Sequence, residues 1–390
     1  MKYSSRVEGL QGRRTSAWEI HRVAQQAAAK GEDVIVLSVG DPDFATPAPI
    51  VERAIEALRG GDTHYNSAVS GRDPLRAAIA AEHARMSGCA VTAANVILTA
   101  GAQNGVFATS LCLLEAGDEV IVPEPMYLTY EACVRAAGAT LVRVPVDPAR
   151  AFHLDCDALE KAVTPRTKAI FFATPCNPTG VVMPRADLER IARLAYQHDL
   201  WVLSDEVYAD LTFEREHVSI MSLSGMAERT VTLGSLSKSH AMAGWRVGWA
   251  IGPTQLIEHM GRLALAMLYG LPGFIQQAAL TALADKARIV ADMREIYRRR
   301  RDVVFEHLSR IPRLRCLLPE AGMFMMVDVS GTGLDTVDFT WRLFRAQGVS
   351  VLDASAFGET ANGFVRLGFV VDEARLADAC KRIAAFVATV

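Results

Sequence analysis

The chain has 390 residues, of which 51% are hydrophobic and 22% are charged, and its formal net charge is −3. This composition predicts a well-packed globule with two domains, or one large α/β domain with an appendage. The near-neutral charge excludes a bulk attraction to nucleic acid or to an anionic membrane. Seven scattered cysteines without CxxC spacing argue against a disulfide framework and a structural zinc site, and they indicate a cytoplasmic protein.

The amino-terminal segment MKYSSRVEGLQGRR lacks the apolar core of a signal peptide, and no apolar run is long enough to span a bilayer. The nearest approach is LALAMLYGLPGFI at 263–275, which two glycines and a proline interrupt. This stretch predicts a buried helix end followed by a loop.

Elements are expected in a clear order along the first two thirds of the chain. A helix around residues 16–30 precedes the main sheet, and short apolar runs then alternate with helical patterns. The strand-like runs lie at 96–99, 119–123, 140–146, 168–173, 200–204, 230–233 and 246–251, with helices such as 128–137 and 186–198 between them. This alternation predicts an α/β fold with a mostly parallel sheet.

The character of the sequence changes near residue 285. A long charge-rich helix comes first, and the run Arg298–Arg301 within it predicts a solvated face rather than a nucleic-acid site. The elements expected after it are a strand at 323–329, a helix at 335–347, a strand at 364–370 and a helix at 372–388. We therefore expect a large domain over 46–284 and a small α+β domain formed by 1–45 and 285–390.

The segment 229–253 carries the strongest chemical signal. A strand leads into a Ser-Leu-Ser-Lys turn that contains Lys238, and Arg246 follows eight residues after the lysine. A guanidinium and two serine hydroxyls match the oxygens of a phosphate, and a lysine beside them can form an imine with an aldehyde. For this segment alone, a surface turn with a solvated lysine is the alternative.

Three further segments follow predicted strands, whose carboxyl ends form the ligand-binding edge of open α/β sheets. In SDEVY, Asp205 can pair with a protonated pyridine nitrogen and Tyr208 can reach the same ring, although a capping aspartate and a packing tyrosine are the alternative. The NPTG loop presents Asn177 as a fixed amide, or as an ordinary turn residue. The turn at 99–105 offers backbone N–H groups and a helix dipole to a phosphate.

Together these segments resemble the class I and II aminotransferases, which are fold-type I enzymes that depend on pyridoxal 5′-phosphate (PLP). The shared motifs are GDPDF, the glycine turn, EPMYLTY, NPTG, SDEVY, SLSK, the arginine eight residues after the lysine, and a late VRL. The resemblance covers the chain from about residue 14 to 385. It implies a large domain with a mostly parallel central sheet, a smaller α+β domain, and a homodimer that shares residues across its active sites.

The resemblance also implies roles for individual residues. Lys238 would hold the cofactor as a Schiff base and move the proton, and Asp205 would pair with the pyridine nitrogen. Tyr208 and Asn177 would bond the phenolic oxygen of the ring, and Tyr127 would stack on the ring face. The residues implied around the phosphate are Gly101, Ala102, Gln103, Ser235, Ser237, Arg246 and, from the neighbouring subunit, Tyr65.

On the substrate side, the resemblance implies that Arg366 binds the α-carboxylate, with Asn177 beside it. Gly40 would bring backbone close to that carboxylate, where only glycine avoids a side-chain clash. No metal is expected.

Three positions depart from the family pattern. Tyr65 stands one residue further from the next glycine than is usual, Tyr127 replaces the tryptophan of some members, and Gly234 stands where some relatives carry asparagine.

Stretches such as AWEIH, EHVSIMSL and SLSKSHAMAGWRVGW are most similar to bacterial arginine–pyruvate transaminases, which indicates arginine as amino donor and pyruvate as acceptor in a ping-pong exchange. Trp18 or Glu19, in the segment that lines the pocket of relatives, is the predicted partner of the guanidinium. One alternative is a PLP-dependent carbon–sulfur β-lyase, which uses the same residues. Another is an aminotransferase-like regulatory protein, for whose DNA-binding module the position of GDPDF near residue 40 leaves no room.

Overall fold

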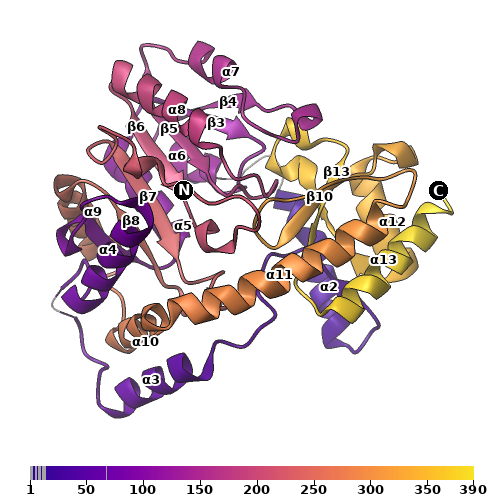
Figure 1. Ribbon diagram of the computed structural model, residues 1–390, viewed down its shortest axis with the longest axis horizontal. Coiled ribbons are helices and arrows are strands. Elements are labelled where there is room, and N and C mark those ends of the chain that lie inside the picture. The colour runs from indigo at the N-terminus through magenta and orange to yellow at the C-terminus, as the bar shows by residue number, and fades with distance from the viewer. Residues whose placement is uncertain (1–2, 5–6, 8–9, 11–14, 67) are drawn as a thin grey trace.

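The computed structural model describes residues 3–4, 7, 10, 15–66 and 68–390. A larger lobe holds a seven-stranded sheet flanked by helices, and a smaller lobe holds a second sheet with the last two helices of the chain (Figure 1). One long helix, α11 (Lys286–Leu308), runs from the larger lobe across to the smaller one (Figure 1). Among the described residues no helix is long and apolar enough to cross a membrane.

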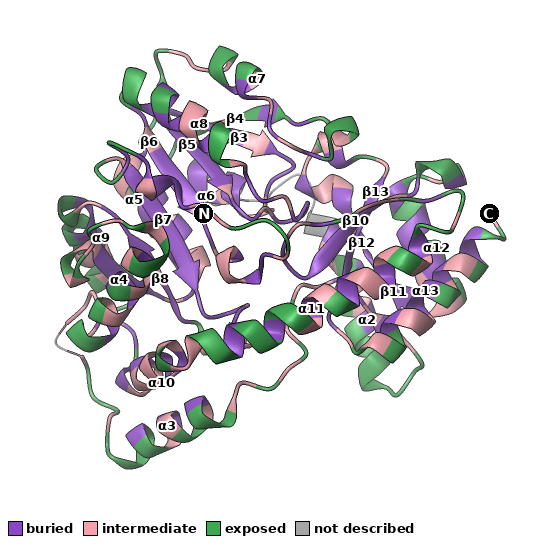
Figure 2. Ribbon diagram, in the orientation of Figure 1, coloured by how far each residue is buried: buried purple, intermediate pink, exposed green. Residues whose placement is uncertain are grey.

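The seven-stranded sheet is mostly parallel, as the sequence predicts. In spatial order its strands are β2 (Val96–Thr99), β8 (Gly248–Ile251), β7 (Thr230–Ser235), β6 (Trp201–Asp205), β5 (Thr167–Ala173), β3 (Glu119–Glu124) and β4 (Thr140–Pro145). Only β8 runs antiparallel to its neighbours. β2 and β7 are buried along their whole length (Figure 2), which fits a sheet covered on both faces.

Helices connect and flank these strands. They are α3 (Ala48–Arg59), α4 (Asp73–Ser87), α5 (Ala102–Leu113), α6 (Tyr130–Ala136), α7 (Cys156–Lys161), α8 (Arg185–Gln197), α9 (Thr254–Met267) and α10 (Gly273–Ala284). In α8 the buried positions recur at helical spacing, so one apolar stripe packs inward while the charged residues face water.

The smaller lobe is built around an antiparallel four-stranded sheet. Its strands, in spatial order, are β12 (Leu352–Asp353), β13 (Phe364–Gly368), β10 (Phe324–Asp328) and β9 (Arg315–Leu317). The helices of this lobe are α2 (Glu19–Ala29), α12 (Thr336–Gln347) and α13 (Glu373–Val387). The parallel pair β1 (Ile35–Val36) and β11 (Val349–Ser350) ties the segment before residue 45 to the carboxyl-terminal part. The predicted boundaries at residues 45 and 285 stay a prediction.

The apolar stretch at 263–275 is only partly buried, contrary to the sequence prediction. Leu265 is 48% exposed, and Leu268 and Tyr269 are 38% and 53% exposed. Leu271 is buried. The end of α9 therefore presents apolar side chains on the surface of the single chain.

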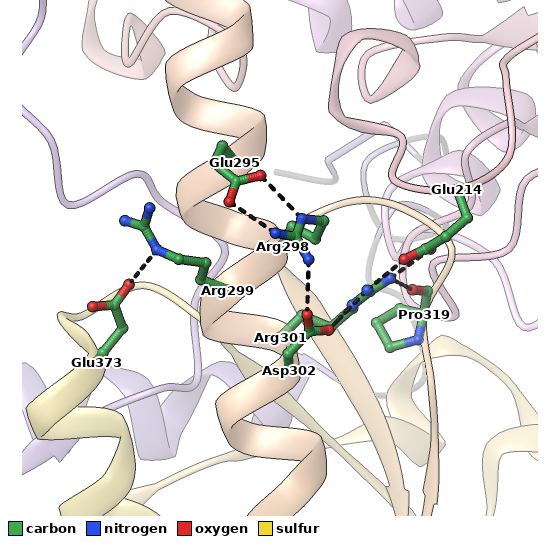
Figure 3. A network of polar contacts seen from close by, with 8 residues as sticks. All are labelled: Glu214, Glu295, Arg298, Arg299, Arg301, Asp302, Pro319 and Glu373. Atoms are coloured by element: carbon green, nitrogen blue, oxygen red, sulfur yellow. Dashed lines mark hydrogen bonds and ion pairs between the residues drawn. The ribbon is translucent and has the colours of Figure 1, made fainter.

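The prediction of a solvated face for the arginine run of α11 is wrong for two of its four members. Arg300 is 4% exposed and Arg301 is 3% exposed. Arg301 donates to both carboxylate oxygens of Glu214, at 2.7 and 2.6 Å, and to the Pro319 carbonyl at 3.2 Å (Figure 3). Arg299 instead points to Glu373 of α13, and both side chains of that pair are about half exposed (Figure 3). The local pattern does not reveal the burial of Arg300 and Arg301, because the carboxylates of Asp43 and Glu214 that pair with them lie far away in the sequence.

Replacing Arg301 with alanine is expected to lower the free energy of unfolding by about 1–3 kcal/mol, because three charge-assisted hydrogen bonds, two to Glu214 and one to Asp302, are lost and the Pro319 carbonyl keeps no partner from this side chain. The exposed Glu214 can be solvated, which limits the cost. Arg299→Ala should change the same quantity by less than about 0.5 kcal/mol. Urea denaturation measures both, and equal effects would contradict this account.

Candidate active site

The carboxyl ends of the parallel strands meet at one edge of the large sheet, where ligands of α/β proteins bind. A cavity of about 290 Å³ lies at this edge. The predicted site residues that line it are Trp18, Gly40, Ala102, Gln103, Tyr127, Asn177, Asp205, Tyr208, Ser235, Ser237, Lys238, Arg246 and Arg366. The fold therefore gathers residues from both lobes around one hollow. Among the described residues, no group of three or more His, Cys, Asp or Glu side chains could hold a metal ion.

Lys238 enters this cavity from the turn after β7. Its ammonium donates to the Gly40 carbonyl oxygen at 2.5 Å. Burial lowers the pKa of Lys238 to about 8, and the nearby guanidinium groups of Arg366 and Arg246 act in the same direction, while Asp41 opposes them. The amine is thus far easier to deprotonate than an ordinary lysine, which suits a nucleophile and base.

Asp205 stands at the end of β6, and a residue for which the sequence motifs predict no role holds it in place. The Tyr130 hydroxyl donates to Asp205 Oδ2 at 2.6 Å, and the Val207 N–H donates to Oδ1 at 3.1 Å. Burial raises the pKa of Asp205, and these two hydrogen bonds work against that shift. Tyr130 is fully buried, with its ring 4.0 Å from that of Phe171. Its position three residues after Tyr127, in the same EPMYLTY motif, was the available signal.

Three side chains border the space next to Asp205. Tyr127 packs edge-on to Tyr130, with ring centroids 5.8 Å apart. Tyr208 is buried, packs edge-on to Phe324 at 5.3 Å, and has a pKa raised by burial. Asn177 follows β5 and is also buried. An aromatic face, a phenol and an amide are thereby offered to a planar ring.

A second group of donors lies beyond Lys238. Gly101, with φ +80°, precedes α5, and no side chain caps the free N–H groups at that helix end. Ser235 and Ser237 join through their hydroxyls at 2.7 Å. The Arg246 guanidinium donates to the Ala243 and Ala100 carbonyls at 2.7 and 3.2 Å. A side-chain carbon at Gly101 would collide with this guanidinium, so only glycine lets the two approach.

This donor set fits PLP. A helix amino end, two hydroxyls and a guanidinium are phosphate ligands, a buried carboxylate suits a pyridinium nitrogen, and a lysine suits an aldehyde. Gly234 also has a local explanation, since the Trp249 indole occupies the space that any side chain at 234 would need.

Arg366, from β13, is 2% exposed and yet has no carboxylate partner among the described residues. Its guanidinium donates to Asn177 Oδ1 at 2.8 Å and to the Ser38 carbonyl at 3.3 Å. Its Nε is buried and has no hydrogen-bond partner among the residues that the structure describes. Burial lowers the pKa of this arginine. Its planar fork is available to a carboxylate brought by a ligand.

Tyr65, which is expected to act from the neighbouring subunit, and Glu19 do not line the cavity of the single chain, and the roles predicted for them stay predictions. Tyr65 is outside the cavity, 85% exposed and packed on Tyr269 with ring centroids 4.9 Å apart. At Gly40, an added side-chain carbon would meet no protein atom closer than 3.8 Å, so the neighbouring protein atoms do not themselves require glycine. Glu19 is not among the residues that line the cavity, and it accepts a hydrogen bond from Arg22 at 2.7 Å on the surface. Asp41 lines the cavity and was missed.

Comparison with known proteins agrees with this geometry. The family model "Aminotransferase class I and II" matches residues 32–383. The chain is 52% identical to the arginine–pyruvate transaminase AruH of Pseudomonas aeruginosa over 98% of both chains. It is 37% identical to aromatic-amino-acid aminotransferase 2 of Thermococcus litoralis over 90% of this chain and 91% of that one. Aspartate aminotransferase from Thermus thermophilus with maleate superposes with a TM-score of 0.93 at 35% identity, over 99% of this chain and 100% of that one.

Replacing Lys238 with methionine is expected to stabilise the cofactor-free protein. Because burial lowers the pKa of Lys238 from 10.5 to about 8, the unfolded chain binds more protons than the folded chain between these values. The lysine therefore costs stability at neutral pH, and this cost disappears as pH rises from about 8 towards 10.5. The gain should be about 1–3 kcal/mol near pH 7 and smaller near pH 9.5, measured by urea unfolding.

Lys168→Met, at an exposed position of β5, is the matched control and should show no such pH-dependent gain. A loss of stability in Lys238→Met at both pH values would show that burial of the Lys238 ammonium does not destabilise the folded protein.

Proposed function

The chain belongs to the class I and II aminotransferases, enzymes that depend on PLP, and on this premise we propose that it transfers the α-amino group of L-arginine to pyruvate. The observation that carries the proposal is the placement of Lys238 between a buried carboxylate, Asp205, and a phosphate-type donor set, with Arg366 lining the same cavity. The choice of donor and acceptor is supported by the 52% identity to an arginine–pyruvate transaminase over 98% of both chains.

We propose the following division of work among the residues. When bound, PLP supplies an electron-withdrawing ring that stabilises negative charge at the substrate α-carbon. Asp205, oriented by Tyr130, would pair with the ring nitrogen, and Arg246 with the donors beside it would hold the phosphate. Arg366 binds the substrate carboxylate and fixes the direction of the Cα–H bond. The Lys238 amine would remove the substrate α-proton and pass it on to the bound cofactor. The lowered pKa of this amine favours both transfers.

We also propose that the enzyme is a homodimer whose partner completes the phosphate side of the site. Arg246 is exposed in the single chain, beside a groove lined by Trp245, Leu268 and other apolar residues. The exposed end of α9 and Tyr65 lie on this side of the molecule. Leu268 lines both this groove and the hollow around Tyr65, and Tyr269 lines that second hollow. A second copy seated here would bury the apolar surface and could bring its own Tyr65 to the phosphate.

A reducing cytoplasm is the proposed compartment. All seven cysteines are free, and two of them, Cys133 and Cys176, lie close to the site: Gln103 donates to the Cys133 sulfur at 3.2 Å. Such thiols persist where glutathione keeps them reduced.

The function is tested first with the purified holoenzyme. L-Arginine alone should abolish the absorbance band of the bound aldehyde cofactor and release one keto acid, and pyruvate should restore the band with release of alanine, since each half-reaction is separate. Conversion by other amino acids but not by arginine would contradict the proposed donor. Formation of pyruvate from cystathionine without an added keto acid would favour the carbon–sulfur lyase instead.

Arg366→Lys provides the matched variant for this test. It keeps the charge but not the planar fork, so kcat/KM should fall about a hundredfold or more for every amino acid while the cofactor band is retained. Unchanged kcat/KM would mean that the carboxylate binds elsewhere.

The dimer makes a separate prediction. Leu268→Glu places a charge in the groove and should convert the protein from dimer to monomer in sedimentation equilibrium, with weaker retention of PLP. Leu318→Glu changes an exposed leucine after β9 and should leave the dimer intact. A dimer that survives Leu268→Glu unchanged would place the interface on another face.

A further inference from the structure

The cavity holds a surplus of positive charge. Among the residues that the structure describes, its lining includes three cationic residues, Lys238, Arg246 and Arg366, and two carboxylates, Asp41 and Asp205. Asp205 is buried and already accepts from Tyr130 and Val207. Of these two described carboxylates, Asp41 therefore remains available to a positively charged group on a substrate.

The two aspartates of the GDPDF segment have different surroundings. Asp43 accepts from Arg300 at 2.7 and 2.9 Å, and this bidentate pair anchors the segment to α11. Asp41, two residues earlier, is exposed and forms no ion pair within 4.0 Å with any residue that the structure describes. Asp41 nevertheless lines the same cavity as Lys238, and its charge opposes the lowering of the Lys238 pKa that burial causes.

An aromatic side chain belongs to the same cavity lining. Trp18 lines the same cavity and packs edge-on to His21, with ring centroids 6.0 Å apart. A carboxylate together with an indole face is a favourable environment for a guanidinium, which stacks on aromatic rings and pairs with carboxylates. Glu19, the other acidic side chain of this segment, is occupied by Arg22 outside the cavity.

We propose that Asp41, assisted by Trp18, binds the positively charged end of the donor side chain and so selects a basic amino acid. The inference rests on the proposed function, in which arginine is the donor. Arg366 and Asp41 then recognise opposite ends of one substrate, and Lys238 acts on the carbon between them. Pyruvate carries no cationic group, so Asp41 acts only in the half-reaction that takes up the donor.

Asp41→Asn is the direct test, with Glu19→Gln as the matched control. In single-turnover measurements on the holoenzyme, Asp41→Asn should lower kcat/KM for arginine about tenfold to a hundredfold, as expected for loss of a hydrogen-bonded charge pair. Values for alanine and for pyruvate should change less than about twofold, within the scatter of neutral surface changes. Glu19→Gln should leave all three within the same limit. An equal loss of kcat/KM for arginine and alanine would overturn the inference, and it would mean that Asp41 acts through the charge state of Lys238 instead.

A binding measurement separates this inference from the proposed function. 5-Guanidinopentanoate keeps the carboxylate and guanidinium of arginine but has no amino group. In 7-methyloctanoate the same carboxylate is kept and an uncharged branched alkyl end replaces the guanidinium. The holoenzyme should bind the guanidino acid more tightly, and Asp41→Asn should weaken that binding about tenfold or more without affecting the binding of 7-methyloctanoate. A wild-type enzyme that fails to convert arginine would overturn the proposed donor. Independently, an unchanged dissociation constant of the guanidino acid in Asp41→Asn would overturn the cationic subsite.

Discussion

A buried guanidinium that finds no anionic partner in the described part of the chain is the constraint on which the site depends. Arg366 belongs to β13 of the small sheet, and its main partner, Asn177, belongs to the loop after β5 of the large sheet, so one 2.8 Å hydrogen bond joins the two lobes. Burying a cation without a counter-ion is costly, and the many contacts of both sheets must sustain it. The arrangement makes sense when the missing anion arrives with the substrate, because ligand binding then removes the penalty.

The remaining polar contacts keep the surroundings of that guanidinium in place. The pair of the buried Arg300 with Asp43 connects α11 to the GDPDF segment. The same segment supplies the Gly40 carbonyl oxygen that accepts a hydrogen bond from the Lys238 ammonium. The helix that crosses between the lobes is thus linked to Lys238 through residues 40–43. On the opposite side, Tyr130 gives Asp205 a fixed orientation despite complete burial.

Local pattern was sufficient for most of the fold, and distant partners explain the failures. The strand at 96–99 was predicted at its observed bounds, whereas the strand expected at 246–251 starts only at Gly248, because Arg246 adopts a left-handed conformation with φ +55°. Burial of Arg300 depends on an aspartate 257 positions away, which no local window contains. The family motifs located the cavity residues, but Tyr65 can be placed in a site only with a second copy of the chain.

The contrast between Arg366 and Asp41 follows from the need of one cavity to take two different substrates in turn. Every amino acid and keto acid brings a carboxylate, so Arg366 can be buried permanently without remaining uncompensated in either complex. In the proposed function, a cationic side chain comes with the donor alone. If Asp41 were buried as deeply as Arg366, it would be an unpaired charge whenever the proposed acceptor pyruvate is bound, at a cost of several kcal/mol. Its exposed position lets water solvate the carboxylate during that half of the cycle. The depth at which each charge lies therefore reflects how often a substrate neutralises it.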